Sequence, residues 1–490
     1  MSNSPQSQPQ PLSADRASVA GSPTLLHRGL GVGSIVFMVV AAAAPLAVVT
    51  ANLPLVISAS GSTAAPLYFL MATVILVLFS VGFTAMSRFV PNAGAFYSYI
   101  QAGLGPRLGI GAAALALGSY GVMLIGINAF LGVATSNLLI AFFNINVPWW
   151  FCSLVALVVI GFLGFRDIEL SSKVLGILLA AEALVVVVLN IAIVSRGGEA
   201  GLNAEPLSVS AFSTGTPSLG LMFAFFSFIG FEATAVFRNE AKDPDRTVPR
   251  ATYIAVVSIG LFYAISSWAV IEGLGVGRAV DKATTDPENL IMNLAQWYVS
   301  PILTDIIQVL LVTSVFACVL SFHNVITRYQ FTLAVKGLLP KALATVDQKH
   351  LTPSKSSLTF SLISLTATAA IAVIGWDPFK QIYTWFSGAA TLGLITLMAM
   401  TSFAVIAFFR KRGCARSTWR TVIAPALSLV GLTVILVLVI GNFSLLVGSA
   451  STAIVLGVLL LATFVAGVVG AEAMRRARPD RYEALTRDSQ

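Results

Sequence analysis

The chain has 490 residues, of which 57% are hydrophobic and only 10% are charged, and its mean hydropathy is +0.88. Soluble globular proteins are about 45–50% apolar and about 25% charged, so this composition excludes a soluble domain and predicts a polytopic membrane protein. The net charge of +8 at pH 7 does not indicate a nucleic acid partner, because the basic residues lie in short loops between apolar stretches.

Apolar stretches of about 20 residues recur along the chain, and each can cross a bilayer as an α-helix. We therefore expect an all-α polytopic membrane protein with twelve transmembrane helices. Their predicted ranges are 30–58, 64–87, 108–141, 148–165, 172–194, 217–237, 250–275, 301–331, 357–375, 380–409, 420–441 and 444–473. The longest loops, external near 195–216 and 276–300 and cytoplasmic near 337–356, are too short to form a domain.

The distribution of Lys and Arg orients these helices. With the N-terminus inside, twenty-five of the 29 basic residues face the cytoplasm, and the external ones are Arg196, Arg278, Lys282 and Lys380. Membrane proteins usually carry such an excess of basic residues in their cytoplasmic loops. We expect a multi-pass protein of the cell membrane with both termini in the cytoplasm.

Motifs for a cofactor are absent from the sequence. The three cysteines, Cys152, Cys318 and Cys414, do not have the spacing of metal ligands. Neither a Walker loop nor a GxGxxG loop for phosphate groups is present, which argues against an ATP-driven pump. We expect no cofactor and no metal, and no pair of nucleophile and base indicates an enzyme.

A glycine and an acid interrupt the predicted span 217–237. Gly230 can leave helical dihedral angles at little cost, and Glu232 is an ionisable group within the membrane. A broken helix in lipid frees backbone groups that can bind a substrate. We expect Ser227, Ile229 and Gly230 to contribute to substrate binding; the alternative is that Gly230 only allows close helix packing.

Three segments together resemble the amino acid–polyamine–organocation (APC) superfamily of secondary transporters. The sequence SFIGFE at 227–232, followed by the acidic loop KDPDRTVPRA, is similar to that family's sixth span and the loop after it. Residues 91–99, PNAGAFYSY, resemble its P-x-A-G-G-x-Y-x-Y motif, and residues 328–340 resemble its R-x-x-x-A-x-x-x-x-G-L-L-P motif. The resemblance covers about residues 28–410.

The resemblance implies a LeuT-like 5+5 inverted repeat, formed by spans 1–5 and 6–10, followed by two peripheral helices. Spans 1 and 6 are expected to be broken at mid-membrane. The implied units are a disordered cytoplasmic tail (1–27), the transport core (28–410), peripheral spans 11 and 12 (411–474) and a cytoplasmic tail (475–490).

The resemblance also implies a substrate site and gates. In the family, backbone N–H groups at the break in span 1 bind the substrate carboxylate, and that break falls on Ala43, Ala44 and Pro45. Proline has no N–H, so one donor is missing and a substrate without a carboxylate stays possible. Phe226 occupies the family's aromatic gate position, where its ring is also expected to contact the substrate. Arg238 and Glu240 are expected to form ion pairs of a cytoplasmic gate, unless this loop is merely solvated.

Glu182 lies within the predicted span 172–194, where many members of the family keep a lysine. An ionisable group in the membrane is costly and therefore usually functional. Burial favours the neutral form of a carboxyl group, so we predict that Glu182, Glu232 or both bind a coupling proton. The alternative is a glutamate that stays neutral and hydrogen-bonded between helices.

These features predict a secondary transporter that imports a small amino acid or organic amine by alternating access, coupled to a proton. The expected partners are this substrate, the proton and the lipid bilayer. A polyamine or amine carrier and an exchanger of substrate for product are alternatives. An ion channel or a membrane receptor is disfavoured, because neither a selectivity filter nor a soluble output domain is evident.

Overall fold

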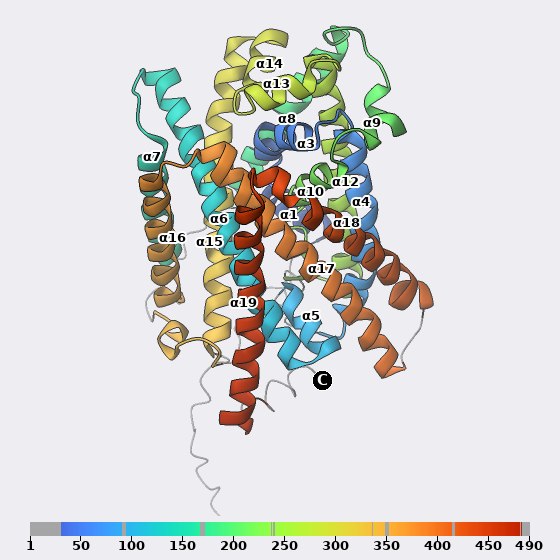
Figure 1. The fold of residues 1–490 in the computed structure, drawn as a ribbon, viewed down its shortest axis with the longest axis vertical. Helices are drawn as coiled ribbons and strands as arrows, with labels where there is room; N and C mark the ends of the chain where they lie inside the picture. The colour runs from blue at the N-terminus through green and yellow to red at the C-terminus, as the bar shows by residue number, and fades with distance from the viewer. Residues whose placement is uncertain are drawn as a thin grey trace, which may run out of the picture.

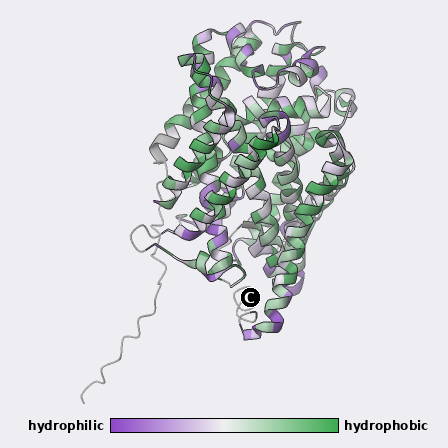
Figure 2. Cartoon of the chain, turned by 60° about the vertical axis from the view of Figure 1, so that its left-hand side comes forward, coloured by the Kyte–Doolittle hydropathy of each residue, from purple (hydrophilic) through white to green (hydrophobic). Residues whose placement is uncertain are grey.

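The computed structural model describes residues 31–90, 95–166, 172–236, 238, 241–335, 337–347, 352–413, 417–480 and 482. The regular elements of this part of the chain are all helices (Figure 1), as the composition predicts. Counted with short interruptions included, ten continuous helical stretches of these residues are long and apolar enough to cross a membrane. Figure 2 shows that the helices consist mostly of apolar residues.

The first helices are α1 (Val32–Ala42), α2 (Pro45–Ala47), η1 (Val48–Asn52), α3 (Leu53–Ser60), α4 (Ala65–Met86), α5 (Ala95–Leu104), α6 (Pro106–Phe143), α7 (Trp149–Phe165) and α8 (Ser172–Ser195). Then follow η2 (Glu205–Leu207), α9 (Val209–Ser213), α10 (Pro217–Phe226), α11 (Ala233–Val236), α12 (Pro244–Leu274), α13 (Ala279–Thr285), α14 (Leu290–Tyr298), α15 (Pro301–Val335) and η4 (Lys341–Ala344). The last are α16 (Ser354–Ile374), η5 (Pro378–Tyr383), α17 (Thr384–Arg412), η6 (Trp419–Ile423), α18 (Ala424–Val447) and α19 (Ala450–Ala477). Proline begins many of these helices, because the first turn leaves its backbone nitrogen without a partner in any case.

The ten long apolar helices coincide with ten of the predicted spans. The other two predicted spans, 148–165 and 217–237, contain the shorter apolar helices α7 and α10. α10 ends at Phe226, well before the predicted end at residue 237, because the chain leaves helical geometry around Gly230. The last helix begins at Ala450 rather than at residue 444.

Two long helices form the centre of the molecule. Most residues in the apolar parts of α6 and of the helix comprising η5 and α17 are buried, whereas α19 buries only Leu460, Ala471 and Met474. α19 packs along the outside of α6, and α18 packs against α17 and α4. The two C-terminal helices therefore lie against a core that the preceding helices build (Figure 1).

The region 276–300, predicted as an external loop, contains the short helices α13 and α14, which lie at the upper end of Figure 1. α14 buries Leu290, Ile291, Leu294 and Ala295 on one side. This apolar face holds the helix on the core. The amphipathic pattern of α14 spans only nine residues, which is too short to distinguish from a loop by periodicity.

The stability of the layer formed by α13 and α14 should depend on pH through Glu288, which lies between them. Burial, supported by the Asp377 and Asp286 carboxylates and opposed by Lys380, raises the pKa of Glu288 to about 7. The fold favours the neutral form of Glu288. The contribution of Glu288 to the free energy of unfolding is therefore complete below the ordinary pKa of 4.5 and is lost as pH rises through about 7. We expect Glu288→Gln to reduce the fall in Tm across this interval, measured by thermal unfolding of the purified protein. Asp281→Asn, an exposed site on α13, is the control, and an unchanged profile for Glu288→Gln would contradict the assignment.

Candidate functional site

The first long helix is interrupted between α1 and α2. α1 ends at Ala42, and Ala44 has left-handed dihedral angles (φ 45°, ψ 67°) before Pro45 begins α2. A proline ring excludes the hydrogen bond that would continue the helix, and it clashes with the preceding turn. The interruption thus lies at the predicted segment from Ala43 to Pro45.

The second interruption separates α10 from α11. Residues 227–232 form turns, and Gly230 has a φ of 108°, which residues with a side chain rarely adopt. The Gly230 N–H donates a hydrogen bond to Oε2 of Glu232 at 2.9 Å. The carboxylate therefore satisfies a backbone donor that the helix break sets free.

A buried asparagine joins the two interrupted helices. Nδ2 of Asn52, at the end of η1, donates to the carbonyl oxygen of Phe223 at 2.7 Å and also to the Ser227 hydroxyl. The Ser227 hydroxyl in turn donates to the same carbonyl at 3.0 Å. This network holds the two breaks side by side. In the sequence, Asn52 is visible only as an amide within an apolar span, and no motif marks it as part of the site.

A cavity of about 40 Å³ lies between the two breaks. Five of the seven predicted substrate-binding residues line it, namely Ala43, Ala44, Phe226, Ser227 and Ile229, whereas Pro45 and Gly230 do not. α6, α15 and η5 supply further lining residues, namely Met123, Ile127, Phe130, Val315, Cys318, Phe322 and Tyr383.

The cavity is closed by aromatic side chains. The rings of Phe226 and Tyr383 meet edge to face, with centroids 6.2 Å apart and planes at 79°. Ligand pockets usually measure about 300–1,000 Å³. These rings and their neighbours must therefore move apart before a molecule the size of an amino acid can enter.

Glu182 lies beside the first break. It projects from α8, is 4% exposed, and faces the backbone of Leu46 in α2 and the side chain of Ser314 in α15. Its Oε2 has no hydrogen-bond partner among the described residues. It is also close enough to Cys318, which lines the cavity, to interact with it electrostatically. Glu182 thus presents a free oxygen atom next to the central cavity.

Glu232 has a different environment. The hydroxyl of Tyr120, on α6, donates to Oε1 of Glu232, and the Gly230 N–H donates to Oε2. Tyr120 is held by stacking on Phe322, with ring centroids 6.0 Å apart. Both carboxylate oxygens of Glu232 are therefore engaged, whereas Oε2 of Glu182 is free. The sequence does not distinguish the two acids, because Tyr120 beside Glu232 and Ser314 beside Glu182 come from other helices.

A family model described as amino acid permease matches residues 34–480. The chain belongs to the amino acid permease family. This membership confirms the resemblance to the APC superfamily that the three motifs indicate.

The curated relatives include two with named substrates. An aromatic amino acid transport protein of Shigella flexneri is 28% identical over 286 residues, which are 56% of this chain and 59% of the relative. A lysine-specific permease of Lactococcus lactis is 26% identical over 327 residues, 62% of this chain and 59% of the relative. An uncharacterised transporter of Mycobacterium tuberculosis is 28% identical over 243 residues, which are 46% of this chain and 54% of the relative. The chain spans about half to three-fifths of the length of these relatives.

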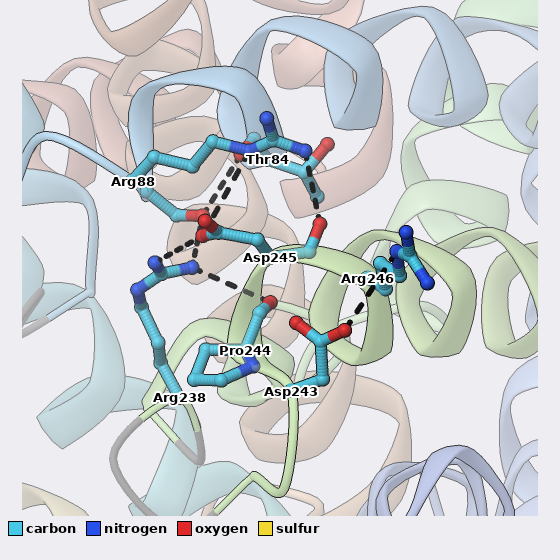
Figure 3. Close-up of polar contacts among 8 residues, drawn as sticks. Thr84, Arg88, Arg238, Asp243, Pro244, Asp245 and Arg246 are labelled. Carbon is cyan, nitrogen blue, oxygen red and sulfur yellow. Dashed lines mark hydrogen bonds and ion pairs between the residues drawn. The ribbon is translucent and has the colours of Figure 1, made fainter.

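At the other end of the second interrupted helix, Arg238 contacts the start of α12. Figure 3 shows Arg238 and Arg88 converging on Asp245. Nη2 of Arg238 lies 2.6 Å from Oδ1 of Asp245, and Nη2 of Arg88 donates to the Asp245 carbonyl oxygen at 2.9 Å. Glu240 lies outside the described residues. Arg238 is thus paired with Asp245, which the sequence does not single out because the loop contains several acids.

Proposed function

We propose that this protein is a secondary transporter that imports a small amino acid or organic amine across the cell membrane, coupled to a proton. The observation that carries the proposal is the cavity between the two helix breaks, with the free Glu182 oxygen beside it. Membership of the amino acid permease family supports an amino acid as the class of substrate. Two relatives named for aromatic amino acids and for lysine differ in substrate side chain, so they support the class alone.

We also propose twelve membrane spans in a 5+5 inverted repeat, with two peripheral helices and both termini in the cytoplasm. The apolar helices α7 and α10 supply two spans beyond the ten long ones. Interruptions in the first and sixth of these spans support the repeat, because they are corresponding positions of the two halves. The exposure of α19 supports its peripheral position.

In the proposed mechanism, the substrate binds where the interrupted helices free their backbone groups, around Ala43–Pro45 and Ser227–Gly230. Phe226 and Tyr383 close over the bound substrate and separate to release it. Glu182 binds the coupling proton, because one of its oxygens is free to accept it. Glu232 holds the second break in shape. Alternating access then exposes the same site to each side of the membrane in turn.

A second candidate function is the transport of an amine that has no carboxylate. Glu182 faces the Leu46 backbone at the start of the half-helix that follows the first break. A substrate carboxylate in the position used by the family would compete with this acid for the same backbone, and Pro45 offers no N–H. An amine, in contrast, would be attracted to Glu182.

Uptake into proteoliposomes tests both candidates. The purified protein is given an inside-alkaline pH gradient and matched pairs of compounds, such as lysine with cadaverine and phenylalanine with phenethylamine. We expect the amino acid of a pair to accumulate and a protonophore to abolish the accumulation. Accumulation of the amine alone would favour the second candidate. Uptake that needs internal substrate and ignores the pH gradient would indicate an exchanger.

We propose that Arg238 and Asp245 form part of a cytoplasmic gate, and this predicts the reactivity of Cys318. Cys318 lines the central cavity, so an impermeant maleimide reaches it from the cytoplasm only when the gate opens. A partly exposed ion pair contributes up to about 1 kcal/mol, so Arg238→Ala should speed labelling by up to about fivefold. The measurement uses a background in which Cys152 and Cys414 are replaced by Ser.

Two further variants control this experiment. Arg246 is exposed and lies 3.7 Å from Asp243, so Arg246→Ala should leave the labelling rate unchanged. The charge-reversed pair Arg238→Asp with Asp245→Arg should restore slow labelling. If Arg238→Ala and the parent label at the same rate, Arg238 is not part of a gate.

A further inference from the structure

A cavity of about 880 Å³ lies apart from the central site, at the end of the molecule that the basic loops place in the cytoplasm. It is enclosed by α4, the start of α12, the end of α17, and η6 with the residues before it. Its lining residues are Val81, Thr84, Ala85, Arg88, Phe89, Asp245, Arg246, Pro249, Arg250, Tyr253, Phe409, Ser417, Arg420 and Thr421. None of them lines the central cavity.

The lining carries an excess of positive charge, with four arginines and one acid. Asp245 is already in contact with Arg88 and Arg238 (Figure 3). Within the described residues, neither Arg250 nor Arg420 forms an ion pair. Positive charge without a partner beside a membrane attracts anionic lipid head groups, and basic pockets between membrane helices bind them.

The wall also has an apolar part, which distinguishes this cavity from a site for a free anion. Val81, Phe89 and Phe409 contribute apolar side chains, and Phe89 is 40% exposed. Next to the cavity, Trp419 of η6 is 48% exposed. A tryptophan at this position is typical of the interface between lipid and water. The cavity therefore offers arginines for a phosphate group and an apolar wall for an acyl chain.

We propose that this cavity binds an anionic phospholipid, with its phosphate group at Arg250 and Arg420 and an acyl chain along Val81, Phe89 and Phe409. The hydroxyl group of Ser417 lies in the same lining, where it can donate to the head group. The bound lipid connects α4 and α12 to α17 and η6. This proposal does not depend on the transported substrate or on the coupling ion.

Lipid titration of the delipidated full chain in detergent tests the proposal. Phosphatidylglycerol and phosphatidylcholine with the same acyl chains are compared by native mass spectrometry and by their effect on the Tm. We expect phosphatidylglycerol to bind at least tenfold more tightly and to raise the Tm. Each arginine near an anionic head group contributes about fivefold to binding. Arg250→Gln with Arg420→Gln should therefore weaken phosphatidylglycerol binding about 25-fold.

Two further variants are compared with the glutamine pair Arg250→Gln and Arg420→Gln. Arg250→Lys with Arg420→Lys keeps the charge and should retain most of the binding, even if the glutamine pair folds poorly. Arg475→Gln with Arg476→Gln removes exposed arginines of α19 that do not line the cavity, and it should leave binding unchanged.

Four results would overturn the proposal. Equal binding of the two lipids would show that the arginines do not select a head group. If the glutamine pair binds phosphatidylglycerol as tightly as the parent, the lipid binds elsewhere. The same conclusion follows if the lysine pair and the α19 control both bind it more weakly, by the same factor. Millimolar inorganic phosphate that raises the Tm as much as phosphatidylglycerol would indicate a site for a free anion.

Discussion

Glu182→Gln should abolish the accumulation of substrate driven by a pH gradient while leaving exchange of substrate across the membrane intact. Glutamine has nearly the same shape as the protonated acid but cannot release a proton, so the binding site persists without coupling. A gradient of one pH unit stores about 1.4 kcal/mol, which supports up to about tenfold accumulation. In the variant the inside and outside concentrations should become equal.

Uptake and counterflow in the same proteoliposomes measure this effect. Glu272→Gln is the matched control, because Glu272 is also buried but lies near the C-terminal end of α12. It should retain accumulation. If Glu182→Gln still accumulates substrate against its gradient, Glu182 does not carry the coupling proton.

Glu232→Leu should destabilise the whole protein, because two buried donors lose their acceptor. The Gly230 N–H and the Tyr120 hydroxyl both donate to Glu232, and each unsatisfied buried group costs about 1–3 kcal/mol. We expect a Tm lowered by several degrees and a reduced yield of folded protein. Thermal unfolding of the purified variants measures the loss.

Glu232→Gln is the matched variant and should be tolerated. Its amide oxygen can accept from the Gly230 N–H, and its amide nitrogen can donate to the Tyr120 hydroxyl after that hydroxyl rotates. The variant should keep both its stability and its pH-driven accumulation. A Glu232→Leu protein as stable as the parent would mean that the carboxylate does not hold the helix break. Substitution by glutamine is therefore expected to have different effects at the two acids. It should uncouple transport at Glu182 and be nearly neutral at Glu232.

The helices and both interruptions follow from local properties of the chain. Apolar length places the membrane helices, since a span needs about 20 such residues whatever surrounds it. Pro45 and Gly230 mark the breaks, because the proline ring and the missing side chain act on their own segment of backbone. The five predicted binding residues that line the central cavity all lie at or next to these two breaks. The edges of the helices and the short helix α14 are less predictable, because their ends depend on contacts with the core.

The partners of the buried polar groups follow from packing, and no local pattern encodes them. Asn52 meets Ser227 and Tyr120 meets Glu232 across more than a hundred residues of chain. Either acid, taken from the sequence, is an equally good candidate for a proton. Their difference arises because the fold gives Glu232 two donors and leaves one oxygen of Glu182 free. Hydropathy and helix breakers are carried by each segment, whereas the satisfaction of a buried carboxylate depends on which helices surround it.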